Sequence, residues 1–306
     1  FIYRPLPVDL VSCVMTSSLN CVTVNPVTSA AMAMIAFNAP EVTFSPCFDT
    51  ITTVGAKPFR LKGGIPLGGT YSGPGVNSMT GIFTPSLAGT GLKTIQYTYT
   101  NVTSCSDGKS KTILVLANPA FSCGNPLTDL RDHKVYPTVQ IGSQCWMQTN
   151  LDFGMTISDL TPQTDNCLVE KYIRYSSFAY SSFYQWDELM RYNSAEASQG
   201  ICPPGWHIPS SAEWDELIAS CNDPGKAGGT LKDKFLPDGF QSYQHGLLYL
   251  NNTWAFTTGF AAGSMYWTST MSGGRAVARG INEMNLSVSL CEASRGNALS
   301  ARCLKD

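Results

Sequence analysis

Apolar and polar residues alternate through the first third of the chain in a pattern typical of strands. In "KTIQYTYT", Ile95, Tyr97 and Tyr99 fall on one face, while threonine and glutamine fall on the other. The runs "EVTF" and "KTILVL" are further strand candidates. Between them, "GGIPLGGTYSGPGV" is dense in glycine and proline, as tight turns between short strands require. We therefore predict a β-sandwich over residues 40–117.

Residues 1–39 carry two shorter strand candidates, "VSCVM" and "NCVTV". This zone is too small to bury a core of its own, so it must either pack on the next domain or insert into a neighbouring subunit. We predict an N-terminal β extension that is a candidate donor strand for self-association.

A helical pattern dominates "CPPGWHIPSSAEWDELIASC" (residues 202–221). Ser210 and Glu213 have the S-x-x-E spacing of a capping box. The apolar residues that follow have the i, i+3, i+4, i+7 spacing of one helical stripe: Trp214, Leu217, Ile218 and Cys221. A second short helix is predicted around "WDEL" at residues 186–189, with Tyr184 and Met190 on its buried face.

The same stretch could instead form a catalytic or metal site, if the side chain of His207 lies close to that of Glu213 or Asp215. However, neither H-E-x-x-H nor the P-C-x-x-C of zinc deaminases is present. We therefore favour a structural role for His207.

Composition limits the function classes. The chain has 306 residues, a net charge of −2 and 14% charged residues, which gives no electrostatic footprint for nucleic acid or an anionic membrane. The most apolar stretch, "AAMAMIAF", is far shorter than the ~20 residues of a membrane-spanning helix. Eleven cysteines lie scattered, none in a C-x-x-C pair, which indicates disulfides and an extracellular location. Because their number is odd, at least one thiol is free or bonds to another chain.

The stretch "GGTYSGPGVNSMTGIFTPSLAGTGLKTIQYTYTNVTSC" resembles the immunoglobulin-like (Ig-like) repeats of large secreted proteins from Bacteroidota-type bacteria. Such repeats are spacers and adhesion stalks rather than enzymes. The resemblance implies an Ig-like β-sandwich at 40–117, followed by a linker, "ANPAFS".

The segments "KVYPTVQIGSQCWMQTNLDFG", "YQWDELM", "GICPPGWHIPSSAEWDELI" and "GSMYWTST" occur in order, and the chain closes with "SARCLKD". They resemble the FISUMP family, the major paralogous domain of bacterial secreted and surface proteins, over residues 123–306. The family looks related to the C-type-lectin-like fold of formylglycine-generating enzymes, which implies an α+β domain.

The sequence lacks the copper, iron and calcium motifs of those related families. Formylglycine-generating enzymes hold copper with a close cysteine pair, whereas Cys291 and Cys303 are far apart in this sequence. Three scattered histidines, His133, His207 and His245, give no iron-site triad, and the calcium motifs of C-type lectins are missing. We therefore expect no catalytic residue, cofactor or metal site.

Weaker site candidates remain. Asp129, Asp132 and His133 form either a weak metal site or, in our preferred interpretation, a solvated turn. Thr50 follows Asp49 in a D-(S/T)-aliphatic motif for O-glycosylation. A sugar-stacking platform is an alternative to core packing for three aromatic residues: Trp146, Trp254 and Tyr266.

Disulfide pairings can be proposed but not deduced. Cys13 and Cys21 could close a small hairpin, which would leave Cys167 alone. The four other proposed pairs are Cys47–Cys105, Cys123–Cys145, Cys202–Cys303 and Cys221–Cys291.

The leading hypothesis is a non-enzymatic extracellular subunit of an adhesive or filamentous, fimbria-like surface assembly. A glycan-binding lectin-like module is the first alternative. An oxidase or metalloenzyme of the formylglycine-generating type is the second.

Overall fold

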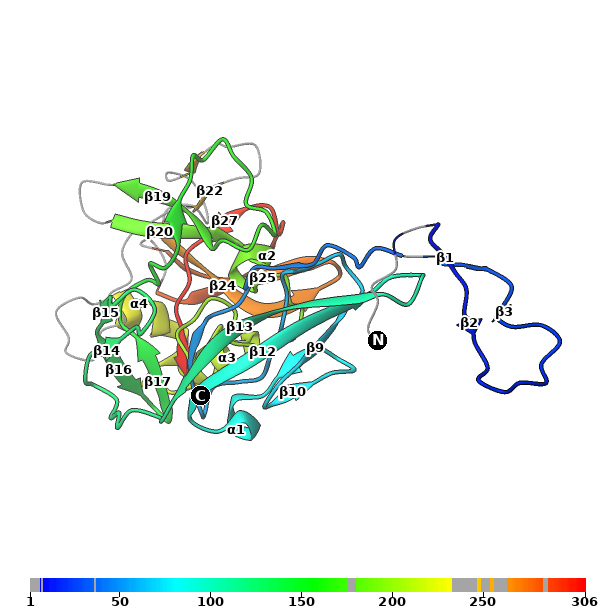
Figure 1. The fold of residues 1–306 in the computed structure, drawn as a ribbon. Helices are drawn as coiled ribbons and strands as arrows, with labels where there is room; N and C mark the ends of the chain where they lie inside the picture. The colour runs from blue at the N-terminus through cyan, green and yellow to red at the C-terminus, as the bar shows by residue number, and fades with distance from the viewer. Residues whose placement is uncertain are drawn as a thin grey trace.

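The structure is a computed structural model that describes residues 6, 8–35, 37–175, 180–232, 247–248, 254–255, 263–282 and 286–306. The described chain is rich in short strands and has few helices (Figure 1). It comprises an N-terminal arm (residues 8–35), a β module (residues 42–116) and a C-terminal module (residues 127–306). Within these residues, no helix is long and apolar enough to cross a membrane.

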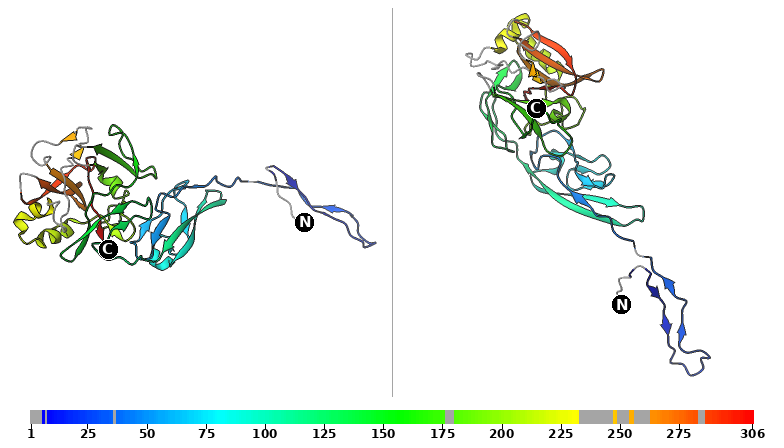
Figure 2. Two further views of the ribbon diagram at one scale, coloured as in Figure 1. Left: turned by 90° about the vertical axis from the view of Figure 1, so that its left-hand side faces the viewer. Right: turned by 90° about the horizontal axis from the view of Figure 1, so that it is seen from above.

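The N-terminal arm is a two-stranded ribbon that projects from the rest of the molecule (Figure 2). Its outer part pairs β2 (Val14–Met15) with β3 (Val27–Thr28), and its inner part pairs β1 (Leu10–Val11) with β4 (Met32–Ala33). The predicted strand in "VSCVM" is present as β1 and β2. The predicted strand in "NCVTV" is wrong, because those residues form the turn at the end of the ribbon.

The β module has one four-stranded sheet in which the first pairing is parallel and the others are antiparallel. Its order is β6 (Ile51–Thr53), β13 (Ser106–Leu116), β12 (Gly91–Thr100), β9 (Thr70–Ser72). The remaining elements are β5 (Thr43–Phe44) paired with β8 (Gly64–Ile65), β10 (Val76–Asn77), β11 (Ile82–Phe83) and β7 (Phe59–Arg60) in one sheet, and helix α1 (Pro85–Ala88).

These strands surround a core that the alternating pattern predicted in part. Ile95 and Tyr97 of β12 are buried beside Phe44 and Phe83. Tyr97 explains one glycine of the turn region: a Cβ atom on Gly64 would lie 2.4 Å from the tyrosine ring. A larger residue at that position would push the turn off the core.

The described part of the C-terminal module contains three larger sheets and four short helical segments. One sheet has the order β16 (Thr138–Ile141), β17 (Gln144–Met147), β28 (Leu304–Lys305), β21 (Trp206–His207). The second has the order β18 (Met155–Thr156), β19 (Glu170–Tyr175), β20 (Tyr180–Gln185), β27 (Ala298–Leu299), β22 (Leu247–Leu248), β23 (Trp254–Ala255). The third has β24 (Gly263–Ser272), β25 (Arg275–Asn282), β26 (Val288–Ala293), and a separate pair joins β14 (Leu127–Thr128) to β15 (Val135–Tyr136).

Both predicted helices are present, as α2 (Trp186–Leu189) and α3 (Ser211–Ala219). The 3-10 helix η1 (Pro224–Lys226) and α4 (Ala227–Lys232) follow. The capping box of α3 is formed by Ser210 and Glu213, as the spacing predicted. Trp214 on the buried face of α3 packs between Trp146 and Tyr266, with ring centroids 5.1 and 5.6 Å apart.

Three disulfides join distant segments. The predicted pairs Cys123–Cys145 and Cys202–Cys303 are confirmed. The predicted pair Cys47–Cys105 is wrong: Cys47 bonds Cys167 of the C-terminal module, and Cys105 is free. The pairing of β6 with Leu114 explains the difference, because Cys105 directly precedes the opposite end of β13, roughly 30 Å from Leu114 at about 3.3 Å per residue.

Two further proposed pairs are wrong. In the arm, the backbone of Cys13 bonds Ser29 across the ribbon, whereas Cys21 lies in the terminal turn, so the ladder holds the two thiols apart. Cys221 and Cys291 are also free, and each thiol instead faces a backbone carbonyl, of Leu217 and Ala278 respectively.

Candidate functional site

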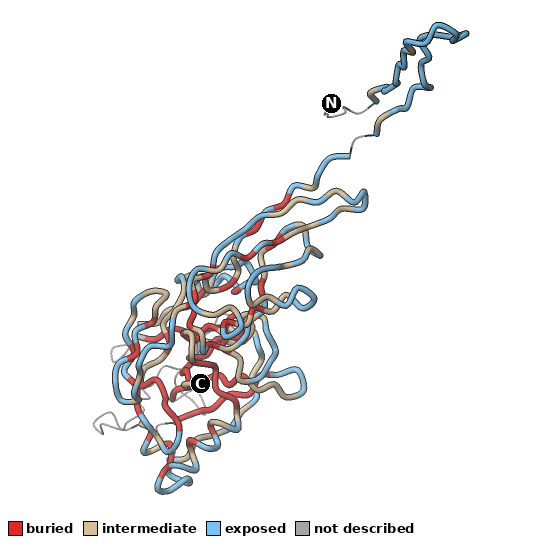
Figure 3. The backbone as a smooth tube through the Cα atoms, turned by 60° about the horizontal axis from the view of Figure 1, so that its bottom comes forward, coloured by how far each residue is buried: buried red, intermediate tan, exposed pale blue. Residues whose placement is uncertain are grey.

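The N-terminal arm exposes most of its large apolar side chains. Leu10, for example, is 71% exposed, and Figure 3 shows exposed residues along nearly the whole arm. An isolated two-stranded ribbon is marginally stable in water, and clustered exposed apolar residues typically mark an interaction surface. The exposed apolar residues of the arm are Val8, Leu10, Val11, Val14, Met15, Leu19, Val22, Val24, Val27, Met32 and Ile35.

The backbone hydrogen bonds of the arm join its two strands to each other. Ser29 N donates to Cys13 O at 2.8 Å, and the paired strands exchange the remaining ladder bonds. Each strand therefore has one edge that no described strand covers. Such an edge presents backbone donors and acceptors to a further strand. The arm also carries two exposed free thiols, Cys13 and Cys21.

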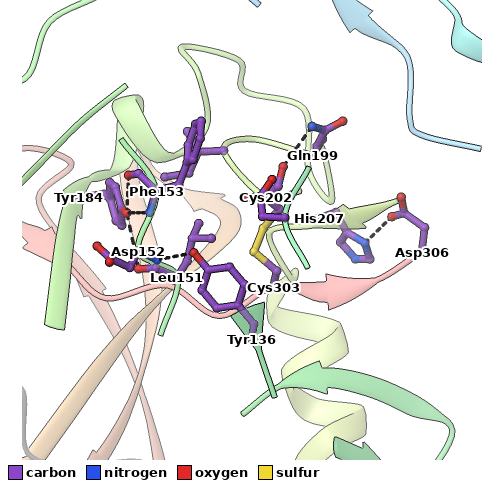
Figure 4. Close-up of a disulfide and its surroundings, with 12 residues drawn as sticks. Tyr136, Leu151, Asp152, Phe153, Tyr184, Gln199, Cys202, His207, Cys303 and Asp306 are labelled. Carbon is purple, nitrogen blue, oxygen red and sulfur yellow. Dashed lines mark hydrogen bonds and ion pairs between the residues drawn. A yellow bond between two sulfur atoms is a disulfide. The ribbon is translucent and has the colours of Figure 1, made fainter. Parts of the chain in front are cut away.

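His207 is a buried structural group rather than an open site. Its Nδ1 lies 2.7 Å from Asp306 Oδ1 (Figure 4), and its Nε2 lies 2.9 Å from Glu213 Oε1. Burial opposes the charged imidazolium, but Asp306 and Glu213 raise the pKa of His207 above its usual value. Both ring nitrogens are occupied, which leaves neither free to bind a metal.

Glu213 couples this histidine to the helix cap. Burial opposes its charge, but His207 and the Ser210 backbone lower the pKa of Glu213 to about 2. Asp306 continues the chain of charges to Lys57 of the β module, whose Nζ lies 3.2 Å from Asp306 Oδ1. This network therefore ties the end of the chain both to α3 and to the other module.

A second charged cluster lies at the junction between the two modules. Asp49 Oδ2 lies 3.1 Å from Arg131 Nη1, and Asp49 Oδ1 lies 2.7 Å from Arg191 Nη2. Burial alone would raise the pKa of Asp49, but the two guanidinium groups hold it below its usual value. Arg131 also pairs with Asp129 and stacks 3.7 Å above the Phe153 ring. Sequence reasoning missed this cluster, because its members come from distant segments.

The structure places the weaker site candidates in different environments. Asp129 is fully buried on Arg131, so the expectation of a solvated turn is wrong for that residue. Asp132 pairs with Lys134 at 3.7 Å, and His133 is exposed. Thr50 is exposed and remains a predicted glycosylation site, although the neighbouring Asp49 carboxylate is held in the junction cluster.

The alternative of a sugar-stacking platform is wrong for two of its three candidate residues. Trp146 and Tyr266 are fully buried and pack against Trp214, so they anchor the core and present no face to a sugar. The side chain of Trp254 lies outside the described part of the chain.

A cavity of about 610 Å³ opens at the module junction. Segments 47–49 and 58–62 of the β module line one side, and residues from 190–200 line the other. Because its walls come from two modules, no local motif in the sequence marks it.

The fold and the disulfides define a β-rich, disulfide-bonded protein with a projecting arm. Residues 139–305 match the model of the Fibrobacter succinogenes major domain, and the chain belongs to this family. The match confirms the FISUMP resemblance over most of the predicted 123–306. No curated protein and no solved structure matched the chain.

Proposed function

We propose that this protein is a non-enzymatic, extracellular subunit that builds an adhesive or filamentous surface assembly through its N-terminal arm. The observation that carries the proposal is the arm itself: a ribbon without a core, with open strand edges and exposed apolar side chains. A neighbouring copy that pairs with the arm would satisfy its edges and cover those side chains.

The location belongs to the same proposal. Three disulfides are typical of an oxidising compartment outside the cytoplasm. The major-domain family suggests a surface-associated protein. The parallel β6–β13 pairing beside an antiparallel sheet supports an Ig-like assignment for residues 40–117. We assign a C-type-lectin-like fold to residues 123–306.

The energetics favour an arm that is covered. Fully burying one valine or leucine side chain contributes about 1.5–3 kcal/mol. A strand added along the edge formed by β1 and β2 would cover exposed side chains next to it, for example Leu10, Val14 and Met15. That gain would offset the entropy lost when two copies associate.

Removal of the arm tests the proposal. Deleting residues 1–35 should convert oligomers into folded monomers, as measured by light scattering after size-exclusion chromatography and by negative-stain electron microscopy. Assembly that continues unchanged without the arm would overturn the proposal.

Two matched double variants distinguish a specific role of the arm from nonspecific association through exposed apolar side chains. Leu10→Asp with Met32→Asp places charge on the arm, where both side chains are exposed. Leu87→Asp with Val102→Asp places the same charge on exposed apolar positions of the β module. Only the first pair should abolish assembly. Equal effects from both pairs would contradict a specific role for the arm.

His207 supports the non-enzymatic part of the proposal, because both of its ring nitrogens are hydrogen-bonded to carboxylates. Elemental analysis of the native protein tests it directly. Copper or iron bound in a one-to-one ratio would favour the oxidase or metalloenzyme alternative instead.

A further inference from the structure

The cavity at the module junction has the size and position of a ligand site. Its volume of about 610 Å³ falls within the ~300–1,000 Å³ typical of small-molecule pockets, which often form between domains. It is separate from the arm, so the proposed assembly does not use it.

The walls of this cavity are held in place. The Asp49 carboxylate links the two sides through Arg191, and the Cys47–Cys167 disulfide joins Cys47 of the lining to a neighbouring segment of the C-terminal module. Lys57 donates to Ala197 O at 2.6 Å beside it. A site fixed in this way loses little entropy when a ligand binds.

The charges that line the cavity favour an anion. Arg60, Lys62 and Arg191 contribute three positive charges, and Asp49 is the single carboxylate among the described residues that line the cavity. That carboxylate is already held between Arg131 and Arg191. The Arg191 side chain remains 26% exposed, and its Nε has no hydrogen-bond partner among the described residues.

The Lys62 ammonium group can also pair with an anionic ligand. Its ion pair with Asp165 spans 2.9 Å, but both side chains are partly exposed. Exposed pairs of this kind contribute about 0–1 kcal/mol, so an anion in the cavity could replace Asp165 at small cost.

The rest of the lining suits a hydroxylated molecule with apolar faces. Phe59 and Tyr192 supply aromatic surface, and Asn193 and Ser194 supply exposed amide and hydroxyl groups. Amides and hydroxyls both donate and accept, as sugar hydroxyls do. A free inorganic anion would occupy only a small part of the volume, because one water accounts for about 30 Å³ of liquid.

We propose that this junction cavity binds an acidic sugar, a hexuronic acid unit of a polysaccharide. Its carboxylate pairs with the cations Arg60, Lys62 and Arg191. The sugar ring lies against Phe59 and Tyr192, and its hydroxyl groups bond to Asn193 and Ser194.

The test compares two trisaccharides by isothermal titration calorimetry on the full chain. Tri-galacturonate carries the carboxylates, and galactotriose is its neutral counterpart. We expect binding of tri-galacturonate at least ten times tighter than that of galactotriose. Absence of tri-galacturonate binding, or equal affinity for the two sugars, would overturn the proposal.

Variants locate the site. Arg60→Gln with Lys62→Gln should weaken tri-galacturonate binding at least tenfold. Lys109→Gln is the matched control, because it removes an exposed lysine paired with Asp107 in the same module but outside the cavity. Undiminished binding by the double variant would place any uronate contact elsewhere and refute the junction site.

A second variant guards against a change in folding. Asn193→Asp places a negative charge in an exposed loop of the cavity wall and should also weaken binding without lowering the thermal midpoint. Full affinity in this folded variant would likewise contradict the proposal. Arm-deleted protein should retain the binding, so a failure of this inference is distinct from a failure of the assembly proposal.

Discussion

At the residue scale, His207 makes the stability of the fold depend on pH. Asp306 and Glu213 raise its pKa, so folding favours the protonated imidazole. The stabilisation is fully present below the ordinary histidine pKa of about 6.5 and is lost as pH rises through the higher folded value. We therefore expect the free energy of unfolding, measured with urea, to fall as pH rises above about 6.5.

The matched variants isolate that contribution. His207→Gln should flatten the decline of stability above about pH 6.5. His133→Asn, at an exposed histidine with positive φ that asparagine tolerates, should leave the slope unchanged. A slope that survives His207→Gln would show that another group titrates.

Local sequence patterns predicted the secondary structure around single residues better than they predicted the partners of those residues. The S-x-x-E spacing predicted the Ser210–Glu213 cap, and the apolar stripe predicted the burial of Trp214. The partnership of His207 with Asp306 could not be predicted, because 99 residues separate them. Core packing, rather than the alternative sugar platform, is correct for Trp146 and Tyr266, whose strands pack under α3.

At the element scale, α3 depends on its cap. Ser210 Oγ accepts from Glu213 N, and Glu213 Oε2 accepts from Ser210 N at 2.7 Å. Ser210→Ala should destabilise the protein by about 1 kcal/mol, the usual effect of losing an N-cap. Urea denaturation at pH 7 measures it.

Ser220→Ala is the control at the other end of the same helix. Its hydroxyl donates to Glu216 O, which solvent can also reach, so its loss should change stability by less than about 0.5 kcal/mol. Equal losses at the two ends would indicate that the capping box contributes nothing specific.

Elements in the β module were predicted where alternation was long, as in β12 and β13. The arm was harder, because strands of two residues carry too little pattern to fix a register. Placing a strand in "NCVTV" failed for that reason. The disulfide partner of Cys47 could not be read from spacing, since the sequence separation from Cys167 is 120.

At the scale of the whole molecule, Asp49 holds the two modules together. Asp49→Asn would remove the carboxylate that pairs with Arg191 and one that pairs with Arg131, which keeps its pair with Asp129. Breaking a buried pair in this way typically costs about 3–5 kcal/mol. We expect a loss of that size in urea denaturation, with the isosteric Asp107→Asn at the exposed Lys109 pair as a near-neutral control. A small effect of Asp49→Asn would show that solvent enters the junction.

Assembly through the arm also predicts covalent links between copies. The ribbon keeps Cys13 and Cys21 apart within one chain, yet both thiols are exposed where neighbours would meet. With oxidised glutathione as the oxidant, two thiols from different copies lose two electrons and two protons to form one disulfide, and glutathione disulfide is reduced to two thiols. We expect a ladder of oligomers on non-reducing gels that collapses to monomer on reduction.

Cysteine variants decide which thiols form these links. Cys13→Ser with Cys21→Ser should abolish the ladder, whereas Cys221→Ser should preserve it, because Cys221 is buried and burial raises the pKa of its thiol. A ladder that persists without the two arm cysteines would move the intermolecular contact away from the arm. The half-buried Cys105 at its base would then be the next thiol to replace.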